Sequence, residues 1–153
     1  MRTKTSESIQ SITMAAKKTW LEKLNVKKES KVKRIDFDFA DIPANSTMLI
    51  ATPKIVEDYI KQIPKGKQAS IRTMRKDLAG EYHADYTCPL TAGIFLRIVA
   101  EANYEKYSQT NSLKGIAPFW RMIEPGSSLA QKLTFGQELI IKQRKAEGLV
   151  ERK

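Results

Sequence analysis

One thiol and one imidazole are the side chains of this sequence with the most versatile chemistry. Cys88 stands at the start of an expected helix, where the helix dipole can stabilise a thiolate and make it a nucleophile. His83 lies five residues earlier and could act as a base or a ligand. The alternatives are a buried structural cysteine and a histidine in a surface loop, and we favour both alternatives.

The same residue counts exclude several classes of site. A single cysteine cannot form an internal disulfide or a cysteine-based zinc site, so we expect no metal and no cofactor. No apolar run approaches the ~20 residues of a membrane-spanning helix, and the N-terminus lacks the apolar stretch of a signal peptide. The expectation is a soluble, cytoplasmic monomer without membrane contact, associated with the nucleoid if the source is bacterial.

Positive charge is the strongest signal in the composition. The chain has 153 residues, with 27 Lys and Arg against 17 Asp and Glu, which gives a formal net charge of +10. Small proteins this basic usually bind a polyanion. Arg72, Arg75 and Lys76 lie on the outward face of an expected helix. We expect them to contact DNA phosphates, although a solvated helix face would look the same.

The charge is concentrated near the N-terminus, which suggests two regions. Residues 1–34 hold ten basic and three acidic residues. We expect them to form a basic, partly disordered extension, with a short helix over 19–24. The basic run 27–34 is either a solvated linker or an arm that contacts phosphates. The folded domain is expected over 35–153.

Patterns of apolar residues predict the elements of that domain. Alternating and apolar runs predict strands at 36–39 and 47–51. Helical spacing behind capping residues predicts four helices. These have Thr52 as the cap before Pro53, Ser70 as the cap before a stop at Gly80, Thr87 as the cap before Pro89, and Gln137 as the start before a stop at Gly148. Residues 107–115 are expected to be a loop, and 116–123 a strand or a buried turn.

The order of these elements predicts an α+β, mainly helical fold. Two helices joined by a short turn and followed by a strand and a turn are typical of a winged helix-turn-helix. The basic residues on the first of these helices suit an element that crosses the phosphate backbone. A plain helical bundle would show similar periodicity.

Several short motifs follow one another in a recognisable order. They are I-P-K-G-K at 63–67, L-A at 78–79, P-F-W-R-M-I at 118–123, Gly136, and E-G at 147–148. This order resembles the DNA-binding domain of alkylguanine–DNA alkyltransferases and alkyltransferase-like proteins. That family carries an I-P-x-G segment, a helix-turn-helix, a P-C-H-R-V strand, a wing with a glycine and a closing helix that ends in E-G. The resemblance spans roughly residues 47–149 and implies a winged helix-turn-helix that binds duplex DNA.

The departures from the family pattern imply that the chain is not an enzyme. The alkyl-accepting cysteine would fall at Phe119 and the histidine base at Trp120, so Glu147 has no relay to orient. Strand alternation would point one of the two rings inward and the other outward. We expect a base pocket lined by Phe119, Trp120 and Arg121, with Phe119 as the ring that faces the base and Arg121 as an ion-pair partner of Glu147.

The third expected helix corresponds to the family's recognition helix, which lies against the minor groove. It begins with the small residues Thr91, Ala92 and Gly93, which allow a helix to approach a groove wall closely. The family's arginine wedge would fall near Gly93, and Arg97 lies one turn later. Alternatively, Gly93 only allows two helices to pack.

Three functional hypotheses follow. The first is a non-enzymatic DNA-binding protein of the alkyltransferase-like kind, which binds duplex DNA and recognises alkylated or flipped bases. The second is a winged-helix transcriptional regulator without a base pocket. The third is an enzyme that uses Cys88.

Overall fold

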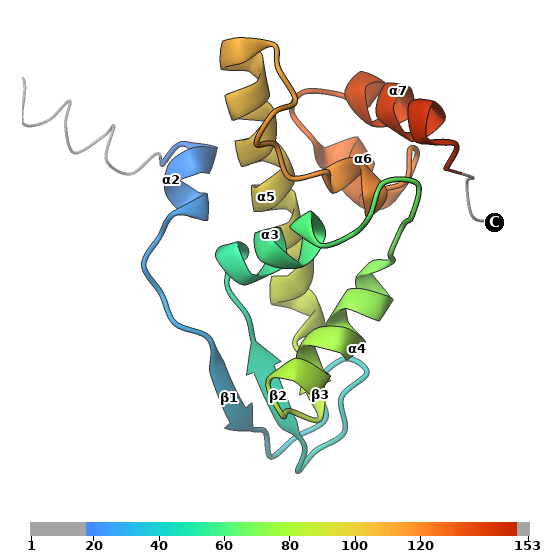
Figure 1. Ribbon diagram of the computed structural model, residues 1–153. Helices are drawn as coiled ribbons and strands as arrows, with labels where there is room; N and C mark the ends of the chain where they lie inside the picture. The colour runs from blue at the N-terminus through green and yellow to red at the C-terminus, as the bar shows by residue number, and fades with distance from the viewer. Residues whose placement is uncertain (1–17, 150–153) are drawn as a thin grey trace, which may run out of the picture.

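A single long helix, α5 (Pro89–Thr110), forms the axis around which the other elements pack. The computed structural model describes residues 18–149, so the first half of the expected, partly disordered extension lies outside the described residues. Pro89 occupies the first position of α5, where a missing N–H is harmless, and Asn111 ends the helix in the left-handed conformation. Figure 1 shows α5 running through the centre of the molecule.

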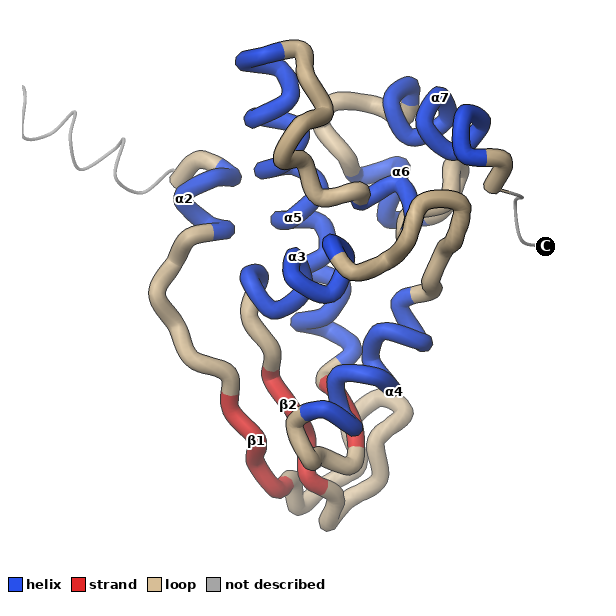
Figure 2. Tube along the Cα trace, in the orientation of Figure 1, coloured by secondary structure: helices blue, strands red, loops and turns tan. Residues whose placement is uncertain are grey.

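Shorter helices surround α5, and a small sheet lies at one end of the molecule (Figures 1 and 2). The helices are α2 (Trp20–Leu24), α3 (Pro53–Lys61), α4 (Ile71–Glu81), α6 (Ser128–Lys132), α7 (Glu138–Glu147) and the 3-10 turn η1 (Phe119–Arg121). The strands are β1 (Lys31–Arg34), β2 (Thr47–Ile50) and β3 (Tyr86–Thr87), in the order β1-β2-β3. β2 pairs antiparallel with β1 and parallel with β3. The fold is therefore α+β.

The capping residues that were expected for three of the helices are confirmed. The side chain of Thr52 accepts a hydrogen bond from the N–H of Ile55 at the start of α3, and Ser70 does the same for Thr73 in α4. Gly148 ends α7 with a φ of +71°. Such a φ favours glycine, so this end of the helix is encoded locally.

The start and length of α5 differ from the expectation. Cys88, not Thr87, is the residue before the helix, and it makes no side-chain cap. The hydroxyl of Thr87 instead donates to the carbonyl of Arg75, which fastens β3 to α4. α5 also continues to Thr110, into the first part of the segment 107–115 that was expected to be a loop.

The N-terminal part of the fold differs more. The expected strand at 36–39 is a tight turn, in which Asp38 accepts a hydrogen bond from the N–H of Ala44 and Phe39 pairs with Ile42. The strand is the basic run that precedes it, β1, whose side chains are all exposed. Backbone pairing with β2 holds β1, so no apolar pattern marks it. Both β1 and α2 lie within residues 1–34, which were expected to form an extension. They pack against β2 and α5, so the folded domain begins before its expected start at residue 35.

The segment after α5 also departs from the winged arrangement. Residues 119–121 form η1, which corresponds to the buried turn and not the strand of the two alternatives for 116–123. The segment expected to form the wing contains α6, which Ser127 caps. Within residues 18–149 every strand precedes α5, and the wing of a winged helix is absent from that range.

A buried amide joins α3, α5 and the chain before η1. Asn103 is fully buried on α5; its amide donates to Glu57 of α3 at 2.9 Å and to the carbonyl of Val99 at 2.9 Å. Its carbonyl oxygen accepts from the N–H of Ala117 at 2.8 Å. Burial alone would raise the pKa of Glu57, but the amide of Asn103 and nearby lysines lower it. The carboxylate therefore stays charged inside the fold.

Replacement of Asn103 by alanine should strongly destabilise the protein. The variant leaves the Glu57 carboxylate and the Ala117 N–H buried without these partners, which should lower the free energy of unfolding by about 3 kcal/mol. Urea denaturation of Asn103→Ala measures the change. The control is Gln109→Ala on the exposed end of the same helix, which should change stability by less than about 0.5 kcal/mol. A similar loss in both variants would contradict the structural role of Asn103.

Candidate functional site

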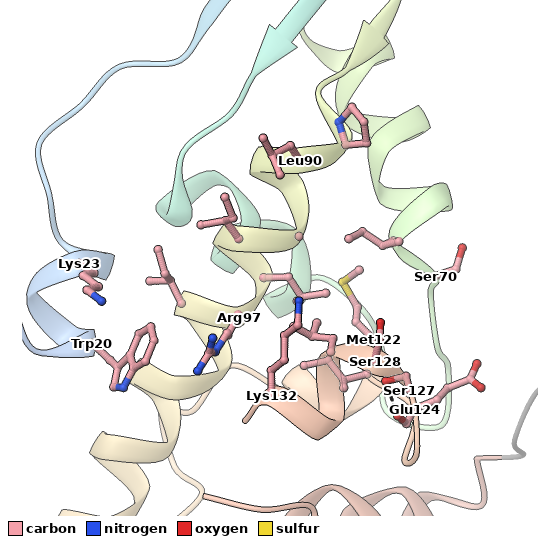
Figure 3. A pocket seen from close by; sticks show the side chains of 18 residues that line it. Trp20, Lys23, Ser70, Leu90, Arg97, Met122, Glu124, Ser127, Ser128 and Lys132 are labelled. Carbon is pink, nitrogen blue, oxygen red and sulfur yellow. Dashed lines mark hydrogen bonds between the residues drawn. The ribbon is translucent and has the colours of Figure 1, made fainter. Parts of the chain in front are cut away.

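A groove of about 660 Å³ lies beside the N-terminal half of α5, between α2, the start of α4 and α6 (Figure 3). The floor includes Leu90, Gly93, Ile94 and Arg97 of α5. These positions are three, four and seven residues apart from the first, so they form one stripe along the helix. We call these four residues the α5 stripe. Leu90 is 61 % exposed and Ile94 is 48 % exposed, which is unusual for side chains so apolar.

The glycine of the α5 stripe is not required for close packing of helices. A Cβ built on Gly93 would meet only the Cδ1 atom of Ile71, at 4.0 Å, which is ordinary van der Waals contact. A larger side chain would therefore fit at this position, so the alternative that Gly93 serves only to let two helices pack is not supported. Its effect is to leave the surface flat between Leu90 and Ile94.

Cations gather where the α5 stripe ends. The Nζ of Lys23 lies 4.2 Å from the centre of the Trp20 ring, and the guanidinium carbon of Arg97 lies 5.1 Å from it. Lys132 of α6 also lines the groove (Figure 3). Among the described residues that line the groove, Glu124 is the one acid. The groove thus combines an apolar floor with an excess of positive charge.

The cations predicted on α4 divide into two kinds. Arg72 and Lys76 are exposed, as a role in phosphate contact requires. Arg75 is different, because its guanidinium donates to both oxygens of Asp41, at 2.8 and 2.9 Å, and to the carbonyl of Thr87 at 3.0 Å. The hydrogen bonds from Arg75 lower the pKa of Asp41. Arg75 therefore ties the turn after β1 to α4, and its place in the expected DNA-binding set is corrected to a structural role.

The three small residues at the start of α5 point in different directions. Gly93 faces the groove, whereas Ala92 is 1 % exposed and packs in the core. Thr91 faces another hollow, and its hydroxyl is buried without a hydrogen-bond partner. The expectation that all three contact DNA is therefore wrong for Ala92, and Thr91 lies away from the groove.

The expected base pocket at Phe119 is not formed. Phe119 is fully buried and packs edge-on against Trp120, with ring centres 5.4 Å apart, and against Phe135 at 5.7 Å. Trp120 is only 4 % exposed. The prediction assumed strand alternation, but the 3-10 turn η1 does not alternate its side chains between two faces. Both rings consequently point into the fold.

The predicted ion pair between Arg121 and Glu147 is confirmed. The Nε of Arg121 donates to Glu147 at 2.9 Å and its Nη2 at 2.8 Å, while the indole N–H of Trp120 donates to the same carboxylate at 2.8 Å. The N–H of Gly66 donates to it at 3.0 Å, and Arg121 also donates to the carbonyl of Ile63 at 2.7 Å. Three motifs distant in sequence, I-P-K-G-K, W-R and E-G, thus meet at one carboxylate.

These contacts control the ionisation of Glu147. Burial would raise its pKa, but hydrogen bonds from Arg121, Trp120 and Gly66 outweigh burial and lower the pKa to about 2. An open hollow of about 590 Å³ lies beside this carboxylate and includes Trp120 and Arg121 in its lining. Trp120 and Arg121 therefore lie at a different place from the groove of the α5 stripe.

Cys88 and His83 occupy different environments. Cys88 is 4 % exposed and packs with Ile35, Ile42 and Met48, and its N–H donates to a β2 carbonyl. His83 is exposed in the turn after α4. Within residues 18–149 no three His, Cys, Asp or Glu side chains are grouped so that they could hold a metal ion. No helix in that range has the length and apolar character to cross a membrane.

Sequence reasoning missed several residues of the groove. Trp20 and Lys23 were assigned to the extension, although their spacing of three residues places them on one side of a helix turn. Leu90 and Ile94 entered only as part of the apolar pattern that predicted the helix after Thr87. Their spacing with Gly93 and Arg97 was the available signal for a separate surface stripe.

Phe119→Ala should lower the free energy of unfolding by about 3–5 kcal/mol, because it removes a fully buried ring and leaves a cavity. The midpoint of urea denaturation measures the loss. Phe37→Ala is the matched control, because Phe37 is 59 % exposed and its replacement should have little effect. If Phe119→Ala were as stable as Phe37→Ala, the ring would not be part of the core.

Glu147→Gln should make the free energy of unfolding less sensitive to pH in the acid range. The pKa of Glu147 is about 2 in the folded protein and 4.5 without these contacts. Because the folded pKa is the lower one, the stabilisation is complete above about pH 4.5 and is lost as the pH falls toward 2. The difference in unfolding free energy between wild type and Glu147→Gln should therefore shrink over that range in urea titrations. The control is Glu138→Gln, at an exposed position on α7, which should show no such pH-dependent difference. If the difference in unfolding free energy between wild type and Glu147→Gln stayed the same from pH 4.5 to 2, the lowered pKa of Glu147 would be refuted.

Comparisons with known proteins identify no relative from which the site could be interpreted. No family model matches the sequence, and no curated protein and no solved structure matches the chain. The resemblance of segment 47–149 to the alkyltransferase-like proteins therefore rests on its motifs alone. Their residues do converge in space, at the carboxylate of Glu147.

Proposed function

We propose that this chain is a non-enzymatic protein that binds duplex DNA, with the α5 stripe lying against the minor groove. The observation that carries the proposal is the combination of exposed apolar side chains with cations on both sides of them. Arg72 and Lys76 are exposed on α4 at one side of α5, and Lys23 lies on α2 at the other (Figures 1 and 3). Two phosphate backbones flank a DNA groove, so cations on both sides of the stripe suit a duplex.

The side chains of the α5 stripe suit a minor groove better than a major groove. Leu90 and Ile94 carry no hydrogen-bonding group that could read base edges, and Gly93 keeps the surface between them flat. Proteins that bind the minor groove often insert aliphatic side chains between base steps. Lys23 and Lys132 near the end of the stripe supply positive charge that suits the negative potential of a narrow minor groove, whereas Arg97 is ion-paired with the buried Glu101 at 3.5 Å.

The proposal includes recognition of an alkylated or flipped base and excludes alkyl transfer. The position that corresponds to the acceptor cysteine is Phe119, which has no nucleophilic atom. A base would have to enter the groove near Ile71, Met122 and Ser127, because these residues line it and Phe119 does not. In this reading α4 and α5 are the helix-turn-helix pair. A wing is implied by the alkyltransferase-like reading and by the transcriptional-regulator alternative alike. It receives less support in both, because the segment that would form it contains α6.

Fluorescence anisotropy with a short duplex, over a range of salt concentrations, tests the proposal. Arg72→Gln with Lys76→Gln should reduce the slope of log affinity against log salt by about 2, because each lost phosphate contact contributes about 0.9. The matched control is Lys142→Gln with Lys145→Gln, which removes the same charge from the exposed face of α7. Equal effects of the two pairs would show binding by net charge and would sink the proposed surface.

The apolar part of the surface is checked in the same assay. Leu90→Ser with Ile94→Ser should weaken binding without changing the salt slope, because no charge is altered. Ile141→Ser, exposed at 51 % on α7, is its control. Duplexes with and without an alkylated guanine then measure lesion preference; a flat salt response of the wild type would contradict DNA binding altogether.

A further inference from the structure

A second hollow, of about 400 Å³, lies on another side of α5. It is a half-open space between α5, the junction of β2 with α3, and residues 25–30, which lead from α2 to β1. We call residues 25–30 the strap. Figure 1 shows the strap passing along one side of the molecule between its two anchored ends. Leu24 at the end of α2 is 1 % exposed, and β1 is paired to β2, so both ends are fixed.

The floor of this hollow is apolar, and it comes from a face of α5 that also packs against the main core. Phe95 and Ile98 lie four and seven residues after Thr91, so these three form a second stripe beside the α5 stripe. Phe95 and Ile98 are only partly buried. Across from them, the strap contributes Val26 and the β2–α3 junction contributes Ile50, Ala51 and Pro53. The hollow has the size and the apolar character of small-molecule sites, which occupy ~300–1,000 Å³.

One polar atom in the wall of the hollow lacks a partner. The hydroxyl of Thr91 is buried and makes no hydrogen bond. A threonine within a helix commonly donates to the carbonyl one turn earlier, and buried hydroxyls are nearly always paired. Because this oxygen is shielded from the space of the hollow, the contact that the lining offers to an occupant is apolar.

The rim of the hollow is positively charged. Lys18, Lys23, Lys28 and Lys31 line it, with Glu29 as the one acid among the described lining residues. None of these four lysines has an ion-pair partner within residues 18–149. An occupant that carries an anionic head group would be attracted to this rim, whereas a cationic one would be repelled.

We propose that the hollow beneath the strap binds an amphiphilic anion: one apolar chain or ring system with a carboxylate or phosphate head. The apolar body lies against Phe95 and Ile98, and the head group lies at the rim among the lysines. Polynucleotides do not fit this description, because their anionic groups are continuous and their bases need polar partners. The hollow shares Lys23 and Ile98 with the lining of the groove, but none of the four residues of the α5 stripe lines it. Its existence does not depend on DNA binding.

Isothermal titration calorimetry of the full chain tests the proposal with single-chain probes below their micellar concentrations. Dodecanoate and dodecyl phosphate distinguish the two head groups, and dodecyltrimethylammonium carries the same chain with the opposite charge. We expect one-to-one binding of at least one anion, and no comparable binding of the cation. Binding of the cation with equal affinity, or binding of neither anion, would overturn the proposal.

Two variants locate the site. Val26→Trp fills the hollow from the strap and should abolish binding of the anion; thermal denaturation checks that the variant is folded. Lys28→Glu with Lys31→Glu should weaken binding by about tenfold or more through loss of charged contacts, and Lys142→Glu with Lys145→Glu is the charge-matched control. Full affinity in a folded Val26→Trp variant, or equal losses in the two charge variants, would refute the site. The DNA assay of the wild type is a separate measurement, so either proposal can fail alone.

Discussion

The fixed position of α5 depends on the buried amide of Asn103. This side chain connects α5 to Glu57 of α3 and to the N–H of Ala117, so the helix cannot slide or rotate without breaking several buried hydrogen bonds. Three faces of α5 have three different surroundings: the core, the groove and the hollow beneath the strap. If α5 turned about its axis by the angle that separates successive residues, these faces would exchange places. The two candidate binding surfaces therefore share one structural cause.

A second carboxylate gives the sequence motifs a structural explanation. Glu147 accepts hydrogen bonds from Gly66, Trp120 and Arg121, and Arg121 continues to the carbonyl of Ile63. These contacts hold α7, η1 and the loop after α3 together, which is a structural role. A motif set that resembles a catalytic family can thus be maintained by packing and ion pairing alone. The motifs meet in space, but within residues 18–149 the wing and the base pocket that the resemblance implied are absent.

The sequence predicted elements whose signals are local, and it failed where distant partners decide. Thr52, Ser70 and Gly148 act within one turn of their own helices, so α3, α4 and the end of α7 could be predicted. β1 could not, because a basic, exposed strand exists only through pairing with β2. Arg75 was assigned to DNA because Asp41, its partner 34 residues away, cannot be identified from spacing. Alternation misplaced the rings of η1, because a 3-10 turn has no two-residue period.

The cluster at Trp20 has a consequence for the free protein. Lys23 and Arg97 both approach one indole ring, in a chain with a formal net charge of +10, and Arg97 also lies 3.5 Å from the carboxylate of Glu101, which is 2 % exposed. Dissolved ions screen exposed charges more than buried ones. Salt should accordingly weaken the repulsion between Lys23 and Arg97 more than it weakens the attraction between Arg97 and Glu101. The α2–α5 contact is then least stable in dilute buffer.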